Sequence, residues 1–328
     1  HLFGPNRPGV SLVYRYGGIS GVDLFLTGFS GITNYGRILI RKDQNGDNFV
    51  DPNDYYERIS GASAGVSHRI RTSEGPTGFS LSLAAFYEYR NALLGFPSNT
   101  LRGTINNILV SPEVGHQWGG RFTLAWSNGL NSYPDGIGPH SGQIVTLTTE
   151  YSLPNAGSDF HQLNTTLSGK AFVNLAGDHT LAFKSVLGLQ WLDVLYQRSY
   201  LVGGSLGENP FSNINRRSFP FRGLPSSDLR GEGTILGSVE YRFPLVKNLP
   251  GMGTAPLWLK NLHGALFSDG GQAFQRQDVT TLIETIPGRE VEKFKWNRFS
   301  LSAGAEIRSD ASLIYAPPLT YRLGYGYV

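Results

Sequence analysis

The chain has 328 residues, of which 16% are charged, with 28 lysines and arginines against 25 aspartates and glutamates. This low charge, together with 40% apolar residues, excludes intrinsic disorder, and a net charge of +3 is too small to indicate nucleic-acid binding. The absence of cysteine excludes disulfides and cysteine-based zinc sites. No run of residues approaches the roughly 18 consecutive apolar residues of a membrane-spanning helix.

Alternation of apolar and polar residues, the period of a β-strand, recurs along most of the chain, whereas helical periodicity is scarce. The pattern predicts about fourteen strands. They cover residues 10–18, 21–31, 32–42, 55–72, 77–91, 105–117, 120–128, 142–153, 159–175, 178–191, 233–244, 261–273, 296–310 and 317–328. No linker or shift in composition divides them, so we expect a single domain over residues 1–328.

Many of these strands are about ten residues long and have one apolar and one polar face. In residues 179–191, for example, Leu181 and Phe183 oppose Thr180 and Lys184. Strands of soluble proteins usually have about 5–6 residues, whereas two-faced strands of this length are typical of transmembrane barrels. Lipid offers no hydrogen-bond partners, so such a sheet must close. The sequence predicts an all-β, antiparallel transmembrane β-barrel; a soluble sandwich or lipocalin-like barrel is the alternative.

The segment DQNGDNFVDPND, residues 43–54, has oxygen ligands at the spacing of an EF-hand loop and resembles the dockerin-like variant with Asp at position 12. Position 6, normally glycine, is Asn48, which also tolerates a left-handed backbone. We expect a structural Ca²⁺ ion here, or else a polar turn, because Asn, Asp, Gly and Pro favour turns. The calcium ligands would be Asp43, Asn45, Asp47, Asp51 and Asp54, with the backbone carbonyl of Phe49.

Three short stretches in the C-terminal third carry a second signal. They are FRGL at 221–224, GSVEYRFPL at 237–245 and FSDGG at 267–271. Glu240 and Asp269 fall on the polar faces of neighbouring predicted strands, so both point into one interior. An unpaired buried carboxylate is costly, and an inward arginine would supply a planar cation with five donors. We therefore predict that Arg222 contacts Asp269, with Glu240 nearby.

These stretches, in this order, resemble the BamA-type outer-membrane superfamily, which includes TamA, FhaC-like translocators and barrel-anchored patatins. In that family, a long extracellular loop folds into a barrel of about sixteen strands. Its Arg-Gly tip contacts the acid of an F-x-D-x-G motif. The resemblance implies that Arg222 and Gly223 are the tip, Asp269 is the wall acid and Glu240 lies on the adjoining strand. Leu224 replaces the more typical aromatic residue. The alternative is a salt bridge that only neutralises buried charge.

The resemblance is clear over residues 140–328. It implies that the family's last strand and the periplasmic POTRA domains lie outside this chain. The parity of the loops indicates either that a first strand also lies outside it or that the pattern leaves one strand unrecognised. Arg216 and Arg217, just before the tip, could meet lipopolysaccharide phosphates, but we expect them to be solvated loop charges. No nucleophile elbow and no histidine pair with metal-ligand spacing is present, so we expect no enzymatic site.

The resemblance implies a role in the assembly or translocation of polypeptides at a bacterial-type outer membrane. The expected partners are outer-membrane lipid or lipopolysaccharide, client polypeptides and other envelope subunits. A passive membrane anchor for a soluble enzyme, propeller or binding domain is the alternative function, and a diffusion porin is a second alternative.

Overall fold

The computed structural model is almost entirely antiparallel β-sheet in the residues that it describes. The described residues are 9–19, 21–36, 40–42, 48–50, 55–71, 78–93, 108–110, 114–132, 138–193, 198–204, 217–225, 228–246, 257–274, 299–313 and 319–328. The fold is a β-barrel of the predicted class.

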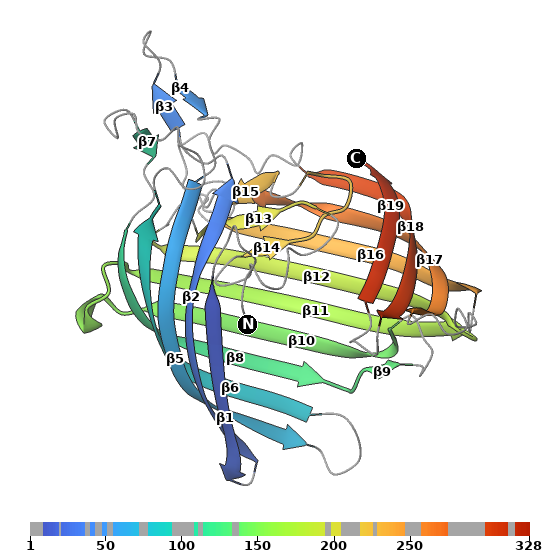
Figure 1. Cartoon of the computed structure of the whole chain (residues 1–328), viewed down its shortest axis with the longest axis horizontal. Coiled ribbons are helices and arrows are strands. Elements are labelled where there is room, and N and C mark those ends of the chain that lie inside the picture. The colour runs from blue at the N-terminus through green and yellow to red at the C-terminus, as the bar shows by residue number, and fades with distance from the viewer. Residues whose placement is uncertain are drawn as a thin grey trace, which may run out of the picture.

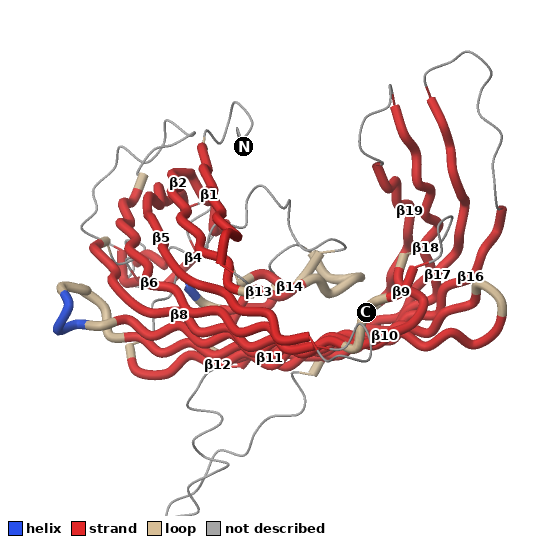
Figure 2. The backbone as a smooth tube through the Cα atoms, turned by 90° about the horizontal axis from the view of Figure 1, so that it is seen from below, coloured by secondary structure: helices blue, strands red, loops and turns tan. Residues whose placement is uncertain are grey.

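Twelve long strands form one sheet, and each pairs antiparallel with the long strand before and after it in the chain (Figure 1). They are β1 (Val10–Ile19), β2 (Val22–Gly36), β5 (Tyr55–Arg71), β6 (Gly78–Ala92), β8 (Gly115–Ser127), β10 (Pro139–Ser152), β11 (Gln162–Ala176), β12 (His179–Leu192), β16 (Gly233–Val246), β17 (Leu257–Phe274), β18 (Ser300–Leu313) and β19 (Leu319–Tyr327). Figure 2 shows the sheet curving into a trough with β1 on one side and β19 on the other. Among the strand pairs of the described residues, none joins β1 to β19.

Tight turns keep consecutive strands side by side. Between β11 and β12, Ala176 pairs with His179 across the two-residue turn Gly177–Asp178. Gly177 has a φ of 55°, in the region that two-residue hairpin turns require and that glycine adopts without steric cost. Such turns produce a meander of adjacent antiparallel strands, which can curve into a barrel.

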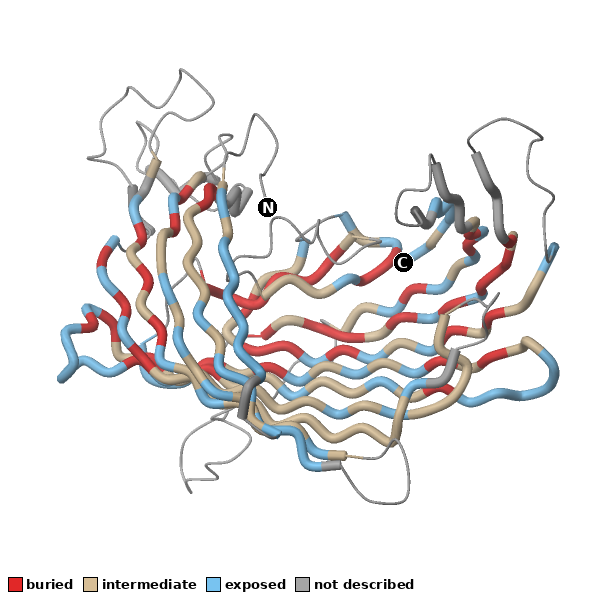
Figure 3. The backbone as a smooth tube through the Cα atoms, turned by 60° about the horizontal axis from the view of Figure 1, so that its bottom comes forward, coloured by how far each residue is buried: buried red, intermediate tan, exposed pale blue. Residues whose placement is uncertain are grey.

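The two faces of the sheet differ in the way that the sequence predicts. On the convex face, Leu187, Val239 and Leu301 are 41%, 43% and 65% exposed, while on the concave face Glu240 and Asp269 are 1% and 4% exposed. Figure 3 shows buried and exposed positions alternating along the strands. The apolar face therefore points outward, as a transmembrane barrel requires.

The prediction of about fourteen strands is wrong in two places. The ranges 21–31 and 32–42 form one continuous strand, β2, up to Gly36. The range 120–128 belongs to β8, which begins at Gly115. The described part of the range 105–117 contributes the short β7 (Ile108–Val110) and the start of β8. Glycines inside these strands interrupt the apolar pattern without forming a turn. A Cβ on Gly119, for example, would lie 2.8 Å from the Phe86 ring, so glycine makes room for that side chain.

Two small sheets accompany the barrel. β13 (Tyr200–Val202), β14 (Ser218–Phe219) and β15 (Leu229–Gly231) pair inside the concave face, and β3 (Ile40–Lys42), β4 (Asn48–Val50) and β7 pair at one end of the long strands (Figure 1). The short β9 (Asn131–Ser132) pairs with β10. The 3-10 turn η2 spans Pro154–Ala156, and the described residues contain no helix that is long and apolar enough to cross a membrane.

Candidate functional site

The connection between β12 and β16 spans residues 193–232, and its described residues, 198–204, 217–225 and 228–232, fold against the concave face. We term these described residues the inward loop. Its small sheet packs on the wall through an apolar cluster of Val202, Phe221 and Leu236. Tyr200 is fully buried, and its hydroxyl donates to the backbone oxygen of Thr165 at 3.0 Å. The loop is therefore docked inside the barrel by apolar packing as well as by polar contacts.

Arg222 makes three hydrogen bonds to Asp269 of β17, more than to any other wall residue for which a bond is described. Its Nε donates to Asp269 Oδ2 at 2.8 Å, its Nη2 donates to Oδ1 at 2.7 Å, and its backbone N–H donates to Oδ2 at 3.0 Å. This is the bidentate arrangement that gives arginine–carboxylate pairs their strength and geometric specificity. The structure thus brings together the two residues that the sequence paired.

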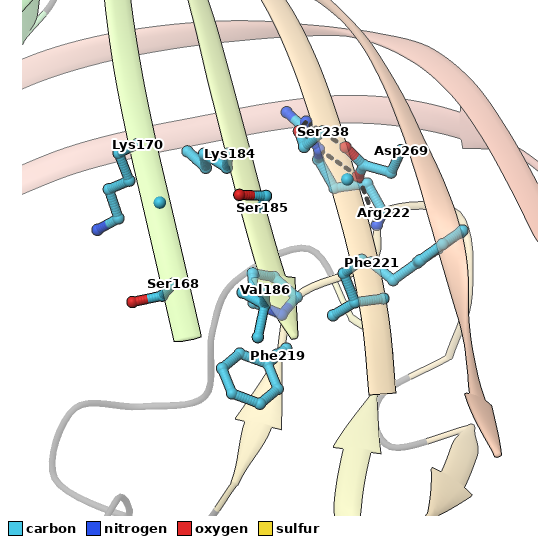
Figure 4. Close-up of a pocket in the computed structure, with 14 residues that line it drawn as sticks. Ser168, Lys170, Lys184, Ser185, Val186, Phe219, Phe221, Arg222, Ser238 and Asp269 are labelled. Carbon is cyan, nitrogen blue, oxygen red and sulfur yellow. Dashed lines mark hydrogen bonds and ion pairs between the residues drawn. The ribbon is translucent and has the colours of Figure 1, made fainter. Parts of the chain in front are cut away.

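The same guanidinium reaches the neighbouring strand, β16. Nη1 donates to Glu240 Oε2 at 2.5 Å, and Nη2 donates to Ser238 Oγ at 3.0 Å. The guanidinium carbon lies 3.7 Å from the centroid of the Phe267 ring, in cation–π contact. Figure 4 shows Arg222 between Ser238 and Asp269. The guanidinium thus donates four hydrogen bonds to the wall, and an aromatic ring covers one of its faces.

Further charged residues of the wall, which the sequence analysis did not identify as site residues, complete the arrangement. Arg308 of β18 donates to both oxygens of Glu240 at 2.9 and 2.7 Å and also to Glu306, and Arg242 donates to Glu240 at 2.6 Å. We term this set the tip cluster; it contains Arg222, Ser238, Glu240, Arg242, Asp269, Glu306 and Arg308. Within this set Arg222 is the third guanidinium beside three carboxylates, and it is the one that comes from the loop.

Burial alone would lower the pKa of Arg222. The hydrogen bonds and charge of Asp269, with the charge of Glu240, outweigh that effect and raise the pKa above its usual value. The guanidinium therefore stays charged throughout the physiological pH range. The cluster has ion pairs and no activated nucleophile, so its chemistry suits holding the loop in place.

Gly223 lets the tip of the loop lie against β18 and β19. Its φ is 95°, and a Cβ at this position would lie 2.7 Å from Val328 Cγ2 and 3.3 Å from Ser302 Cβ. Opposite it, a Cβ on Gly326 of β19 would lie 3.1 Å from the Gly223 backbone nitrogen. Both the backbone conformation and the close approach require glycine.

The loop leaves part of the interior open. A cavity of about 330 Å³ lies between the loop and strands β11 to β17, beside Arg222 (Figure 4). Its lining includes Ser168, Lys170, Lys184, Phe219 and Asp269. The tip therefore borders free space on one side and the wall on the other.

The expectation that Arg217 is a solvated loop charge is wrong. Its Nη2 donates to Glu150 Oε2 of β10 at 2.7 Å, and its side chain is 12% exposed. The preceding Arg216 lies outside the described residues. The signal that was missed is Glu150, a carboxylate on the polar face of a strand with no other acid.

The predicted calcium segment is described only in part. Asp43, Asn45, Asp47, Asp51 and Asp54 lie outside the described residues, and only the backbone of Phe49 is placed, in β4 opposite Arg41. Elsewhere in the described residues, no group of three or more His, Cys, Asp or Glu side chains is arranged to hold a metal ion. Calcium binding at this segment remains a prediction.

The sequence and the fold both resemble those of known proteins. The Omp85 superfamily domain matches residues 20–317. The chain belongs to the Omp85 superfamily. The family match begins at residue 20, whereas the resemblance of the sequence motifs is clear only from residue 140 onward. Membership of this superfamily implies an outer-membrane location, in keeping with the outward apolar face.

Two solved structures share the fold of this Omp85 barrel. BamA from Haemophilus ducreyi, lacking POTRA domains 1–3, is 15% identical with a TM-score of 0.62; the alignment covers 98% of this chain and 62% of that one. CdiB from Acinetobacter baumannii is 11% identical with a TM-score of 0.52, and 98% of this chain covers 50% of it. The chain thus spans less than two thirds of either structure. No curated protein matches it significantly.

Proposed function

We propose that this Omp85 barrel assembles or translocates polypeptides at the outer membrane, and that Arg222 and Gly223 act with Glu240 and Asp269 as a latch for the inward loop. The observation that carries the proposal is the position of the Arg222 guanidinium between two wall carboxylates. A loop that is tied down by side-chain contacts, without a covalent link, can be released and seated again. Superfamily membership supports the polypeptide-handling role.

The mechanism involves no covalent chemistry. In this proposal, an incoming polypeptide strand pairs with an exposed strand edge by β-augmentation, in which main-chain hydrogen bonds supply the affinity. The latched loop keeps the interior occupied until the client engages. The packed sheet of β13, β14 and β15 inside the barrel favours this role over an open diffusion porin. Clients and envelope subunits would be the partners, and lipid would cover the convex face.

The test is Arg222→Ala in the complete gene product, expressed in its native host in place of the wild-type copy. Removing one partner of a buried ion pair costs about 3–5 kcal/mol, and less where water enters. We expect a several-fold loss of client proteins in the outer membrane or the medium, measured by quantitative proteomics of the envelope. Arg222→Lys should be intermediate, because lysine cannot form the bidentate pair.

Arg58→Ala is the matched control, since Arg58 is exposed on β5. It should leave client levels unchanged. Wild-type client levels in the Arg222→Ala strain, at equal barrel abundance, would contradict the latch and favour the passive-anchor alternative.

A further inference from the structure

A second group of charged residues holds the other part of the inward loop. Glu150 of β10 accepts a hydrogen bond from Arg217 Nη2 at 2.7 Å and one from Arg198 Nη2 at 3.0 Å. Arg121 of β8 donates to the other oxygen of Glu150 at 2.7 Å. One wall carboxylate therefore binds two arginines from the loop and one from the wall.

Arg198 is anchored more deeply than Arg217. Its side chain is 2% exposed, and its Nη1 donates to Gln117 Oε1 of β8 at 2.7 Å. Its backbone oxygen accepts from Gln190 Nε2 of β12 and, at 3.2 Å, from Arg217 Nη1. The two loop arginines are thus tied to each other and to three strands. We term Gln117, Arg121, Glu150, Arg198 and Arg217 the base cluster.

Apolar packing near the base cluster also holds this part of the loop against the wall. Tyr200 lies over Gly188 of β12, where a Cβ would be 2.5 Å from Tyr200 Cε1. Its hydroxyl is 3.0 Å from Thr166 Oγ1. Only a glycine leaves room for the ring at that point, so the wall has a slot for the start of β13.

The base cluster and the tip cluster contact different parts of the sheet. The base cluster contacts β8, β10 and β12, whereas the tip cluster contacts β16, β17 and β18. Their composition also differs, because three guanidiniums hydrogen-bond the single carboxylate of Glu150, whereas the tip cluster contains three guanidiniums and three carboxylates. The nearby carboxylate of Glu88 is hydrogen-bonded by Arg90. Glu150 is therefore the residue on which the base depends most.

We propose that Glu150, Arg198 and Arg217 are positioning residues that fix the base of the inward loop independently of the Arg222 latch. Release of the tip then moves the residues around Arg222 while Arg198 to Tyr200 stay docked. The inference rests on the proposed function of the loop as a latched, movable element. It makes the loop a flap that opens from one end.

Two buried serines provide matched reporters, because the chain has no cysteine of its own. Ser199, in the base of the loop, is 5% exposed, and Ser302, on the wall beside Gly223, is 3% exposed. Each is changed to cysteine separately in the full-length protein, reconstituted in lipid nanodiscs. The rate of modification by a maleimide-polyethylene glycol reagent is measured by gel shift. Ser199→Cys reports release of the base, and Ser302→Cys reports release of the tip.

Glu150→Gln should raise the labelling rate of the Ser199 reporter by roughly tenfold or more, since it removes the carboxylate charge that three guanidiniums bond. It should leave the Ser302 reporter near its wild-type rate. Glu150→Asp keeps the charge and should restore much of the protection. Asp228→Asn, which removes an exposed acid of the same loop, is the control and should change neither rate.

Arg222→Ala should give the opposite pattern, with the Ser302 reporter labelled faster and the Ser199 reporter protected. If Arg222→Ala does not speed the labelling of the Ser302 reporter, the latch is contradicted. The independent base is still tested by the effect of Glu150→Gln on the Ser199 reporter. Equal protection of the Ser199 reporter in Glu150→Gln and wild type, or simultaneous release of both reporters, would overturn the independent base. If Glu150→Gln does not fold, as judged by heat-modifiable migration, Arg217→Gln provides the same comparison with a smaller expected rise.

Discussion

At the scale of single residues, the tip depends on a glycine as much as on the arginine before it. Gly223 occupies the left-handed region at a φ of 95° and touches β18 and β19. A side chain there would meet two penalties, one from the backbone and one from contact with Val328. The first penalty would occur in any surroundings, whereas the second arises only because the loop is seated.

Gly223→Ala should therefore destabilise the seated loop by about 1–3 kcal/mol, plus the contact penalty. Faster labelling of the Ser302→Cys reporter would be the measurement. Gly177→Ala is the control, because Gly177 also has a positive φ, of 55°, but its Cβ would meet nothing within 4 Å. If the two alanine variants loosen the protein equally and neither affects the reporter, the close approach of the tip is unimportant.

Sequence reasoning found Arg222, Asp269 and Glu240 because a short motif marks each one. It did not find Arg308 as a partner, although Glu306 and Arg308 share the polar face of one predicted strand. Two charges of opposite sign, two positions apart, point to a wall ion pair, but their partner on another strand depends on register. The register places Glu240 opposite Ala182 of β12 and Phe267 of β17, and no local pattern in the sequence encodes it.

At the scale of elements, strand existence was easier to predict than strand number. Two-faced segments of ten or more residues leave few alternatives, so most long strands were placed within a few residues. Glycines within β2 and β8 divided the pattern and suggested extra strands. In β8, Gly119 accommodates the Phe86 ring, which is a contact between strands and leaves no trace in the local sequence.

The segment 43–54 leads to a prediction at this scale. Lys42 and Asn48 pair across the antiparallel strands β3 and β4, so residues 43–47 connect two paired strands. We propose that Ca²⁺ binds there through Asp43, Asn45, Asp47, Asp51, Asp54 and the carbonyl of Phe49. Titration calorimetry of the purified full-length protein should show binding with a Kd on the order of 10⁻⁴ M, as in extracellular calcium modules.

The double variant Asp43→Asn, Asp47→Asn should abolish that heat, because two carboxylates are lost. Asp178→Asn, in the β11–β12 turn, is the control and should bind as the wild type does. Absence of any calcium-dependent heat in the wild-type protein would leave the segment as a polar turn.

At the scale of the whole molecule, the distribution of side chains is the reverse of that in a soluble protein, and it indicates that lipid surrounds the barrel. Apolar residues cover the convex face, and ion pairs fill the concave one. Alternation in the sequence predicted two unlike faces, and the length and number of the strands favoured the apolar face as the outer one. The base cluster could not be predicted in the same way, because Glu150 and Arg217 are 67 positions apart and no motif marks either residue.

The outward face predicts a depth-dependent response to charge. Val239 lies at the middle of β16 and Leu245 near its end, and they are 43% and 47% exposed. An arginine on the lipid face costs about 2–4 kcal/mol at the bilayer midplane and about 0–1 near the interfaces. Val239→Arg should therefore destabilise the barrel markedly more than Leu245→Arg in urea titrations of the protein folded into lipid vesicles. Equal costs for the two variants would show that the convex face does not contact hydrocarbon.

The tip cluster also bears on the order of barrel assembly. Its hydrogen bonds join residues up to 68 positions apart and draw on the loop and three separate strands. A slip of one residue in the register of β16 or β17 would turn Glu240 or Asp269 to the opposite face. Arg222 can therefore dock only when these strands have paired correctly. A seated loop is therefore expected only in a correctly registered sheet, and a misregistered one should leave the loop open to proteases.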